Sequence, residues 1–236
     1  MIVYLFFGTS YFLILAAALP ALFLLMRVYS MDKVEKEPIG LIGRLVLMGI
    51  LSTFAAVATE LLGTRVLSSF FSESSIIYNL LMYFIVVAGS EEGFKYLLLK
   101  KATWNHPEFN CSFDGIVYAV AVALGFALWE NFGYIRAYGI EVAAIRAVTA
   151  VPGHMCFGIF MGLWYGLAKR AQLEGSSARC KDCLKKSVLV PMIIHGIYDF
   201  IAVTNESFGL FLPFIVIMFI FSYRTIKKSS LNDAYL

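Results

Sequence analysis

Apolar residues run along this chain in long stretches separated by short polar segments. A helix needs about 20 apolar residues to cross the hydrocarbon core of a bilayer. The pattern predicts an all-α fold, a polytopic membrane helical bundle of about seven transmembrane helices in a single domain, 1–236. Segments 70–80 and 136–147 could instead be short interfacial helices, so the exact helix count stays open. The predicted helices cover residues 2–26, 40–61, 76–99, 112–135, 147–168, 186–204 and 208–224.

The composition excludes a soluble domain. Hydrophobic residues make up 60% of the chain and charged residues only 15%, and the mean hydropathy is +0.79. The net charge of +3 does not indicate a nucleic-acid partner, because the basic residues are spread along the ends of the predicted helices. The partner that the composition predicts is the lipid bilayer.

The basic residues predict the orientation in the membrane. Most of the 19 Lys and Arg residues fall in segments 27–36, 100–101, 169–186 and 224–228, which lie on one side if the seven helices alternate. Because basic segments stay in the cytoplasm, we expect the N-terminus outside and the C-terminus inside. The run 2–26 is expected to be the first transmembrane helix and not a signal peptide, because it is long and no basic residue precedes it.

Two polar features outside the predicted helices suggest no chemistry. The turn DKVEKEP, residues 32–38, is expected to be a solvated turn next to the membrane, with Pro38 just before the next helix, where its missing N–H does no harm. Cys180 and Cys183 form a lone C-x-x-C, whereas a structural zinc site needs four ligands. We therefore expect four reduced thiols without a function.

Charged residues inside the third predicted helix are harder to explain. Glu91 and Glu92 lie near its middle, where a charge costs about 2.5–3.5 kcal/mol on insertion scales. Lys95 is four and three residues further on, so one ammonium can reach either carboxylate on a helix. The simplest interpretation is a buried ion pair that fixes helix packing; the alternative is a polar cavity.

Two further predicted helices carry candidate site residues toward their outer ends. Glu130 and Asn131 lie near the end of 112–135, and Glu130 could simply extend to the membrane interface. His154 lies a few residues inside 147–168 and could be a hydrogen-bonding strut between helices. In the same helix, Gly158 and Gly162 form a Gly-x-x-x-Gly face suited to close helix packing.

The sixth predicted helix places His195 and Asp199 four residues apart, hence on one face. Asp199 can then accept a hydrogen bond from one ring nitrogen of His195 and fix its tautomer. Pro191, just before them, permits a local opening of the helix. A histidine oriented by a carboxylate at membrane depth is difficult to explain as packing alone.

Acids and imidazoles on four helices are expensive in lipid unless they converge on one polar cavity, and such residues mark function. The expected chemistry is hydrolysis, in which a buried carboxylate acts as general base and a histidine assists. The chain has no Gly-x-Ser-x-Gly, Ser/Lys or H-E-x-x-H motif. Two histidines and a glutamate could also ligate zinc, so the need for a metal stays open. The metal ligands would then be His154, His195 and either Glu91 or Glu92.

The spacing of these residues resembles the PrsW family of bacterial membrane proteases, distant relatives of the CAAX prenyl protease and Abi group. The resemblance covers about residues 30 to 200, and it includes, loosely, the acidic turn before Pro38. CAAX enzymes typically show Glu-Glu-x-x-x-Arg and Phe-x-x-x-His; Lys95 and Glu130 depart from that pattern in favour of PrsW. The motifs read Glu91-Glu92-x-x-Lys95, Phe126-x-x-x-Glu130-Asn131, His154 after Pro-Gly, and His195-Gly-x-x-Asp199.

The resemblance implies a glutamate-dependent intramembrane endopeptidase in the bacterial plasma membrane. Its substrate would be a single-pass membrane anti-sigma factor, cut first on the extracytoplasmic side so that a sigma factor is released under envelope stress. The rival interpretation is an ion- or proton-coupled transporter that uses the same carboxylates, although the chain shows no internal repeat. By analogy with the family, the expected catalytic residues are Glu91, Glu92, His154, His195 and Glu130, supported by Lys95, Asp199 and Asn131.

Overall fold

The computed structural model describes residues 2–204 and 209–236, with side chains from Ile14 onward. The described residues form helices joined by short turns, with one isolated bridge between Cys111 and Tyr235 in place of any sheet. The predicted start of the last helix at 208 lies outside the described residues. In chain order the helices are α1 Ile2–Ser30, α2 Ile39–Phe70, α3 Ile76–Leu80, a π-helical segment Leu81–Val87, α4 Ala88–Thr103, α5 Asp114–Tyr138, α6 Glu141–Val148, α7 Ala150–Leu173, α8 Ser177–Thr204 and α9 Phe211–Leu231.

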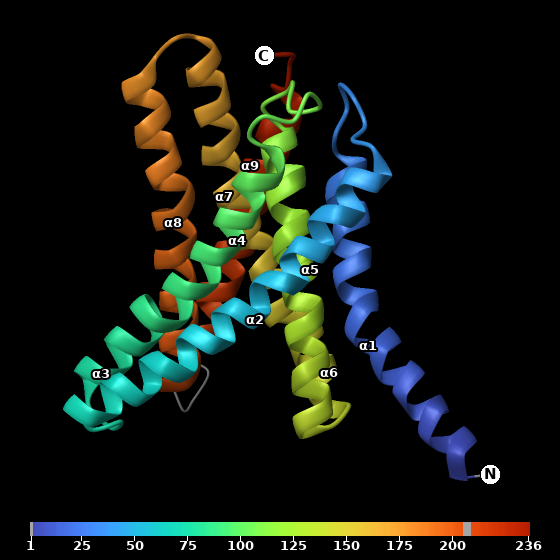
Figure 1. The fold of residues 1–236 in the computed structure, drawn as a ribbon, viewed down its shortest axis with the longest axis vertical. Coiled ribbons are helices and arrows are strands. Elements are labelled where there is room, and N and C mark those ends of the chain that lie inside the picture. The colour runs from blue at the N-terminus through green and yellow to red at the C-terminus, as the bar shows by residue number, and fades with distance from the viewer. Residues whose placement is uncertain (1, 205–208) are drawn as a thin grey trace.

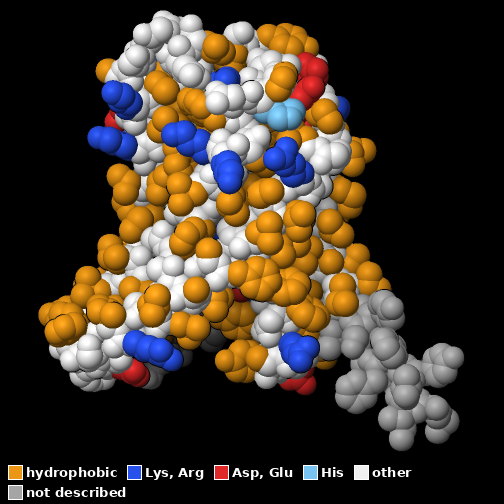
Figure 2. All heavy atoms as spheres, in the orientation of Figure 1, with side chains coloured by type: hydrophobic (Ala, Val, Ile, Leu, Met, Phe, Trp, Pro, Cys, Tyr) orange, Lys and Arg blue, Asp and Glu red, His pale blue; other side chains and the backbone are white. Residues whose placement is uncertain are grey.

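The long helices run between two ends of the molecule (Figure 1). The α1–α2 turn, the α4–α5 loop, the α7–α8 turn and the C-terminus lie at one end; the N-terminus, α3 and α6 lie at the other. Lys and Arg side chains gather toward the first end, above a broad apolar belt (Figure 2). This is the alternation that the sequence predicted, and the positive-inside rule assigns the first end to the cytoplasm.

The predicted fold class, an all-α polytopic membrane bundle, is confirmed. Among the described residues, four helical stretches are long and apolar enough to cross a membrane: α2, α5, α6 with α7, and α8. The predicted boundaries were less accurate: α2 continues to Phe70 instead of ending at 61, and α8 begins at Ser177 instead of 186. Because α8 starts so early, Cys180 and Cys183 lie in its first turns, buried and unbridged.

The core is built around α5, which packs against α1, α2 and α7. Every residue of α5 from Asp114 to Ala127 is buried. Glycines allow this close approach: a Cβ on Gly125 would lie 2.1 Å from the Val46 carbonyl oxygen of α2, and one on Gly162 would lie 2.4 Å from the Gly115 carbonyl oxygen. The predicted Gly-x-x-x-Gly face of α7 therefore packs directly on α5.

The third predicted helix is not a regular α-helix. Its middle, Leu81–Val87, is π-helical, and α4 begins only at Ala88, three residues before Glu91. π-Helical turns insert a residue into the helix and often occur next to functional sites. Here the π-helical segment ends immediately before α4, the helix that carries both glutamates.

The acidic turn after α1 is not solvated as expected. Asp32 is 1% exposed and Glu37 is 4% exposed, so both carboxylates are buried. The Tyr29 hydroxyl donates to the Glu37 carbonyl at 2.8 Å, which folds the turn back on the end of α1. Pro38 does precede α2, as predicted.

Close packing at Gly125 gives the first test. We expect Gly125→Ala to lower the free energy of unfolding by about 1–3 kcal/mol, because the new methyl group collides with main-chain atoms of α2. Gly133 lies on the same helix, and a Cβ added there would have no atom within 4 Å, so Gly133→Ala should be neutral or stabilise by up to about 1 kcal/mol. Thermal unfolding of both variants in detergent is the measurement; equal melting temperatures would contradict the packing argument.

Candidate active site

The polar residues predicted on four helices do converge. Glu91 from α4, Glu130 from α5, His154 from α7, and His195 and Asp199 from α8 line one cavity of about 230 Å³. Glu92 and Lys95 lie behind its wall, 0% and 1% exposed. The remaining lining residues are Glu60, Tyr83, Val87, Tyr134, Arg146, Ala150, Phe157, Tyr198 and Val203.

The Lys95 ammonium is the centre of this arrangement. It donates to Glu91 Oε2 at 3.0 Å and to Glu92 Oε1 at 2.7 Å, and it lies 3.2 Å from His154 Nδ1. Its Nζ is also 3.9 Å from the centre of the Phe126 ring. One lysine therefore bridges two buried carboxylates, as the i+3 and i+4 spacing predicted, and links α4 to α7.

The hydrogen bonds assign the tautomer of His154. An ammonium has no acceptor, so Nδ1 must accept from Lys95, and the ring proton is on Nε2. Nε2 then donates to Glu130 Oε2, 2.9 Å away. Both ring nitrogens are thus engaged, which makes His154 a link between Lys95 and Glu130.

His195 has a carboxylate on each side. Its Nδ1 lies 3.0 Å from Glu92 Oε1 and 4.0 Å from Glu91 Oε2, and its Nε2 lies 3.3 Å from Asp199 Oδ2. The predicted pairing with Asp199 is therefore present. A neutral ring could donate to only one of its two close carboxylates, so this environment favours the doubly protonated imidazolium. Stacking on Phe157, with ring centres 4.5 Å apart, fixes the plane of the ring.

Glu130 does not extend to the interface as a free carboxylate. Its Oε2 accepts from Arg146 at 2.7 Å as well as from His154. The Arg146 Nε also donates to Asn131 Oδ1 at 3.2 Å, and Asn131 in turn donates to the Ala17 carbonyl of α1. Asn131 is fully buried and does not line the cavity, so it supports Arg146 from behind.

The sequence analysis missed two charged residues of the cavity lining, Glu60 and Arg146. Glu60 of α2 lines the cavity and accepts from the Ser90 hydroxyl at 3.4 Å. It lies next to the last residue of the helix predicted over 40–61, and the sequence analysis did not single it out. Arg146 was counted as an outer-loop charge, but α6 folds it back over Glu130. Glu60 could have been found only if α2 had been predicted to continue to Phe70, which places Glu60 inside the helix.

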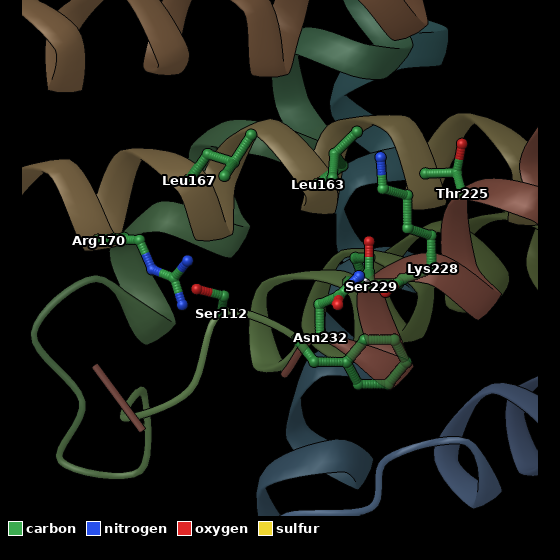
Figure 3. A pocket seen from close by; sticks show the side chains of 10 residues that line it. Ser112, Leu163, Leu167, Arg170, Thr225, Lys228, Ser229 and Asn232 are labelled. Carbon is green, nitrogen blue, oxygen red and sulfur yellow. Dashed lines mark hydrogen bonds between the residues drawn. The ribbon is translucent and has the colours of Figure 1, made fainter. Parts of the chain in front are cut away.

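A second cavity, of about 370 Å³, contains none of these residues (Figure 3). It lies between the ends of α5, α7 and α9, where the Arg170 side chain points toward Ser112 and the Lys228 side chain points toward Leu163. It lacks a carboxylate or an imidazole in its lining. This cavity therefore offers none of the carboxylate or imidazole groups that the sequence predicts for hydrolysis.

Comparison with known proteins identifies the family. Residues 37–225 match the PrsW-protease family, described as "PrsW family intramembrane metalloprotease". The chain belongs to the PrsW family. It is 37% identical to the protease PrsW of Oceanobacillus iheyensis over 92% of this chain and 95% of the relative, and 31% identical to the protease PrsW of Bacillus subtilis over 92% and 95%. No solved structure gives a significant match.

Membership in the PrsW family makes the chain a peptidase, and its apolar helices make it a multi-pass protein of the bacterial membrane. The transporter interpretation is therefore displaced. The family assignment does not give the role of each side chain in the cavity, which must be inferred from the geometry.

The family description implies a metal, and the cavity can be tested for it. Donor atoms of Glu91, Glu92 and His154 lie within 4.8 Å of one another, and Glu92 Oε2 is buried without a hydrogen-bond partner. However, the Lys95 ammonium already contacts a donor atom of all three residues. A divalent cation and an ammonium would repel each other at such distances. The residues as arranged therefore do not fit a metal ion, and we derive no step through one.

The central ion pair gives the second test. We expect Lys95→Met to lower the free energy of unfolding by about 3–5 kcal/mol, because it leaves two buried carboxylates without their cation. Adding Glu92→Gln should recover part of the loss by removing one of those charges. Lys101→Met on the same helix is exposed and should change stability by no more than about 0.5 kcal/mol. Thermal unfolding in detergent measures all three variants; a stable Lys95→Met protein would refute the central role of the ammonium.

Proposed function

We propose that this protein makes the first, extracytoplasmic-side cut in a single-pass membrane anti-sigma factor, leading to release of a sigma factor in envelope-stress signalling. Membership in the PrsW family supports the peptidase part of this proposal. The depth of the cavity supports the side of cleavage, and the environment of Glu91 supports the mechanism.

The cavity lies in the half of the bundle that the positive-inside rule assigns to the outside. At 1.5 Å per residue, Glu130 is about 12 Å from the outer end of α5 at Tyr138 and about 24 Å from its inner end. His154 is only about 6 Å from the start of α7, and His195 about 14 Å from the end of α8. A peptide bond that reaches this cavity enters from the extracytoplasmic side or from the outer leaflet.

Glu91 carries the mechanistic proposal, because of the two glutamates only Glu91 lines the cavity. Lys95 holds Glu91 through Oε2, which fixes the carboxylate beside the cavity. A carboxylate in this position is suited to orient a water molecule and take its proton as the water attacks a peptide carbonyl. Glu92, fully buried, would act behind it as the partner that holds Lys95 and His195.

His195 is the best-placed general acid. It lines the same cavity, and the two carboxylates on its ring nitrogens favour the protonated form. In the proposed reaction Glu91 takes a proton from water, the hydroxide adds to the peptide carbon, and His195 gives a proton to the leaving amine as the C–N bond breaks. The proton that Glu91 took from water then passes to His195, which restores the starting protonation states. Arg146, also in the lining, would stabilise negative charge on the substrate carbonyl.

The glutamates provide the direct test. We expect Glu91→Gln, alone or with Glu92→Gln, to reduce cleavage of a co-expressed, tagged single-pass anti-sigma factor at least about 100-fold, because the amide cannot accept the proton of water. Immunoblots of the membrane fraction would compare the fragment with the intact substrate. Equal amounts of enzyme in the membrane must be shown for each variant.

Glu73→Gln is the matched control, because Glu73 is exposed in the turn before α3, away from the cavity lining. It should cleave like the unmodified protein. A fragment of equal intensity from the Glu91→Gln protein would end the proposed mechanism. If the protein cleaves other single-pass proteins but no anti-sigma factor, the peptidase activity stands and the proposed substrate is refuted.

Metal removal gives an independent test of the mechanism. Because Lys95 takes the place between the three donor residues, we expect purified protein to retain its cleavage rate after dialysis against EDTA or 1,10-phenanthroline. A rate that falls at least about tenfold and returns on addition of Zn²⁺ would show that Lys95 moves aside for a metal. A zinc-dependent peptidase of known sensitivity, treated in parallel, confirms that the chelator works.

A further inference from the structure

A second cluster of buried acids lies at the opposite end of the bundle from the catalytic cavity. Asp32 and Glu37 come from the turn between α1 and α2, and Asp114 from the first turn of α5. They are 1%, 4% and 1% exposed, and one oxygen of each lies within 4.8 Å of the others. None of them lines the cavity in which we propose that hydrolysis takes place.

Two of the three carboxylates are held in place through one oxygen each. Glu37 Oε2 accepts from the buried Tyr118 hydroxyl at 2.7 Å. Asp114 Oδ2 accepts from the main-chain N–H groups of Asn110 at 3.0 Å and Cys111 at 2.6 Å. These bonds explain the position of each carboxylate.

Asp32 has no such explanation. Both of its carboxylate oxygens are buried without a hydrogen-bond partner. The nearby Lys36 ammonium donates instead to the main-chain carbonyls of Tyr29 and Asp32. The unpartnered Asp32 carboxylate thus lies beside the carboxylates of Glu37 and Asp114. Among the described residues no ion pair neutralises it.

Asp233, in the C-terminal tail, extends the cluster. Its Oδ1 accepts from the Phe113 N–H at 2.9 Å, whereas its Oδ2 is buried without a partner. With Cys111 and Asp114 it forms a second group of ligand atoms within 4.8 Å of one another. Asp114 therefore joins two overlapping sets of ligand atoms from three separate parts of the chain, and only the set with Asp32 and Glu37 consists of oxygens alone.

Buried carboxylates without a cation are unfavourable. Either protons or a bound cation must offset this cost. The oxygen-rich character of the cluster distinguishes it from the catalytic cavity, where Lys95, Arg146 and His195 already supply positive charge.

We propose that Asp32, Glu37 and Asp114 bind one hard divalent cation, Mg²⁺ or Ca²⁺, at the cytoplasmic end of the bundle. Both ions prefer carboxylate oxygens, and Ca²⁺ takes six to eight oxygen ligands, whereas Mg²⁺ takes six in strict octahedral geometry and keeps several waters. The cation ties the α1–α2 turn to the start of α5, the central helix. The site is independent of the proposed catalytic mechanism, because the two share no residue.

The test is the thermal unfolding of the full chain in detergent, first stripped with EDTA and then titrated with Ca²⁺ or Mg²⁺ at constant ionic strength set with KCl. We expect the unmodified protein to gain about 5–10 °C in Tm at a cation concentration about 100 times the Kd. Asp32→Asn should be at least as stable as the unmodified protein in EDTA, because it removes an unpaired buried charge. It should then gain no more than about 1 °C from either cation.

Asp182→Asn is the matched control, because Asp182 lies near the same end of the bundle, is 57% exposed and pairs with Lys186. It should respond to the cation like the unmodified protein. An unmodified protein whose Tm neither cation changes would overturn the proposal in favour of protonated acids. An Asp32→Asn protein that responds fully would also overturn it, by placing the ion elsewhere.

Calorimetric titration of the unmodified protein with each cation keeps the test decisive if Asp32→Asn fails to fold. One bound ion per chain is expected, and the heat should be unchanged in the Asp182→Asn protein. No binding of either cation would overturn the proposal without any need for the Asp32 variant.

Discussion

The contact of one lysine with two glutamates is the constraint on which the rest of the structure depends. Lys95, Glu91 and Glu92 are all buried on one helix, where each charge alone would be prohibitive in lipid. The distances from Lys95 Nζ to Glu91 Oε2, 3.0 Å, and to Glu92 Oε1, 2.7 Å, are therefore a condition of folding as well as of the proposed chemistry. Since the ammonium cannot leave without stranding two carboxylates in a low-dielectric interior, the geometry of the proposed active site and the stability of α4 are held by the same interaction.

Close helix packing is what lets the ion pair reach its other partners. Gly49 and Gly125 bring α2 against α5, and Gly158 and Gly162 bring α7 against α5. With bulkier residues the helices would stand further apart, and His154 could not bridge Lys95 to Glu130 at 3.2 and 2.9 Å. The small residues thus contribute to the site although none of them touches it.

Local spacing made part of the site predictable. Lys95 reaches both glutamates, and Asp199 reaches His195, because i+3 and i+4 pairs on a helix must meet. Contacts that depend on where helices end could not be predicted in this way. Glu60 requires α2 to continue to Phe70, and the partner of Glu130 requires the short helix α6 to turn back. The prediction of a solvated acidic turn was wrong for the same reason, because Asp32 is buried near Asp114 at the start of α5, which is distant in the sequence.

Both ends of the bundle bury several carboxylates, but the charges that balance them differ. At the outer end, buried acids have Lys95, Arg146 and His195 as cations supplied by the chain itself. At the inner end, Asp32 and its neighbours have hydrogen-bond donors for some oxygens and no cation within ion-pair distance among the described residues. The charge balance at the inner end must therefore come from outside the chain, either as protons or as a bound cation.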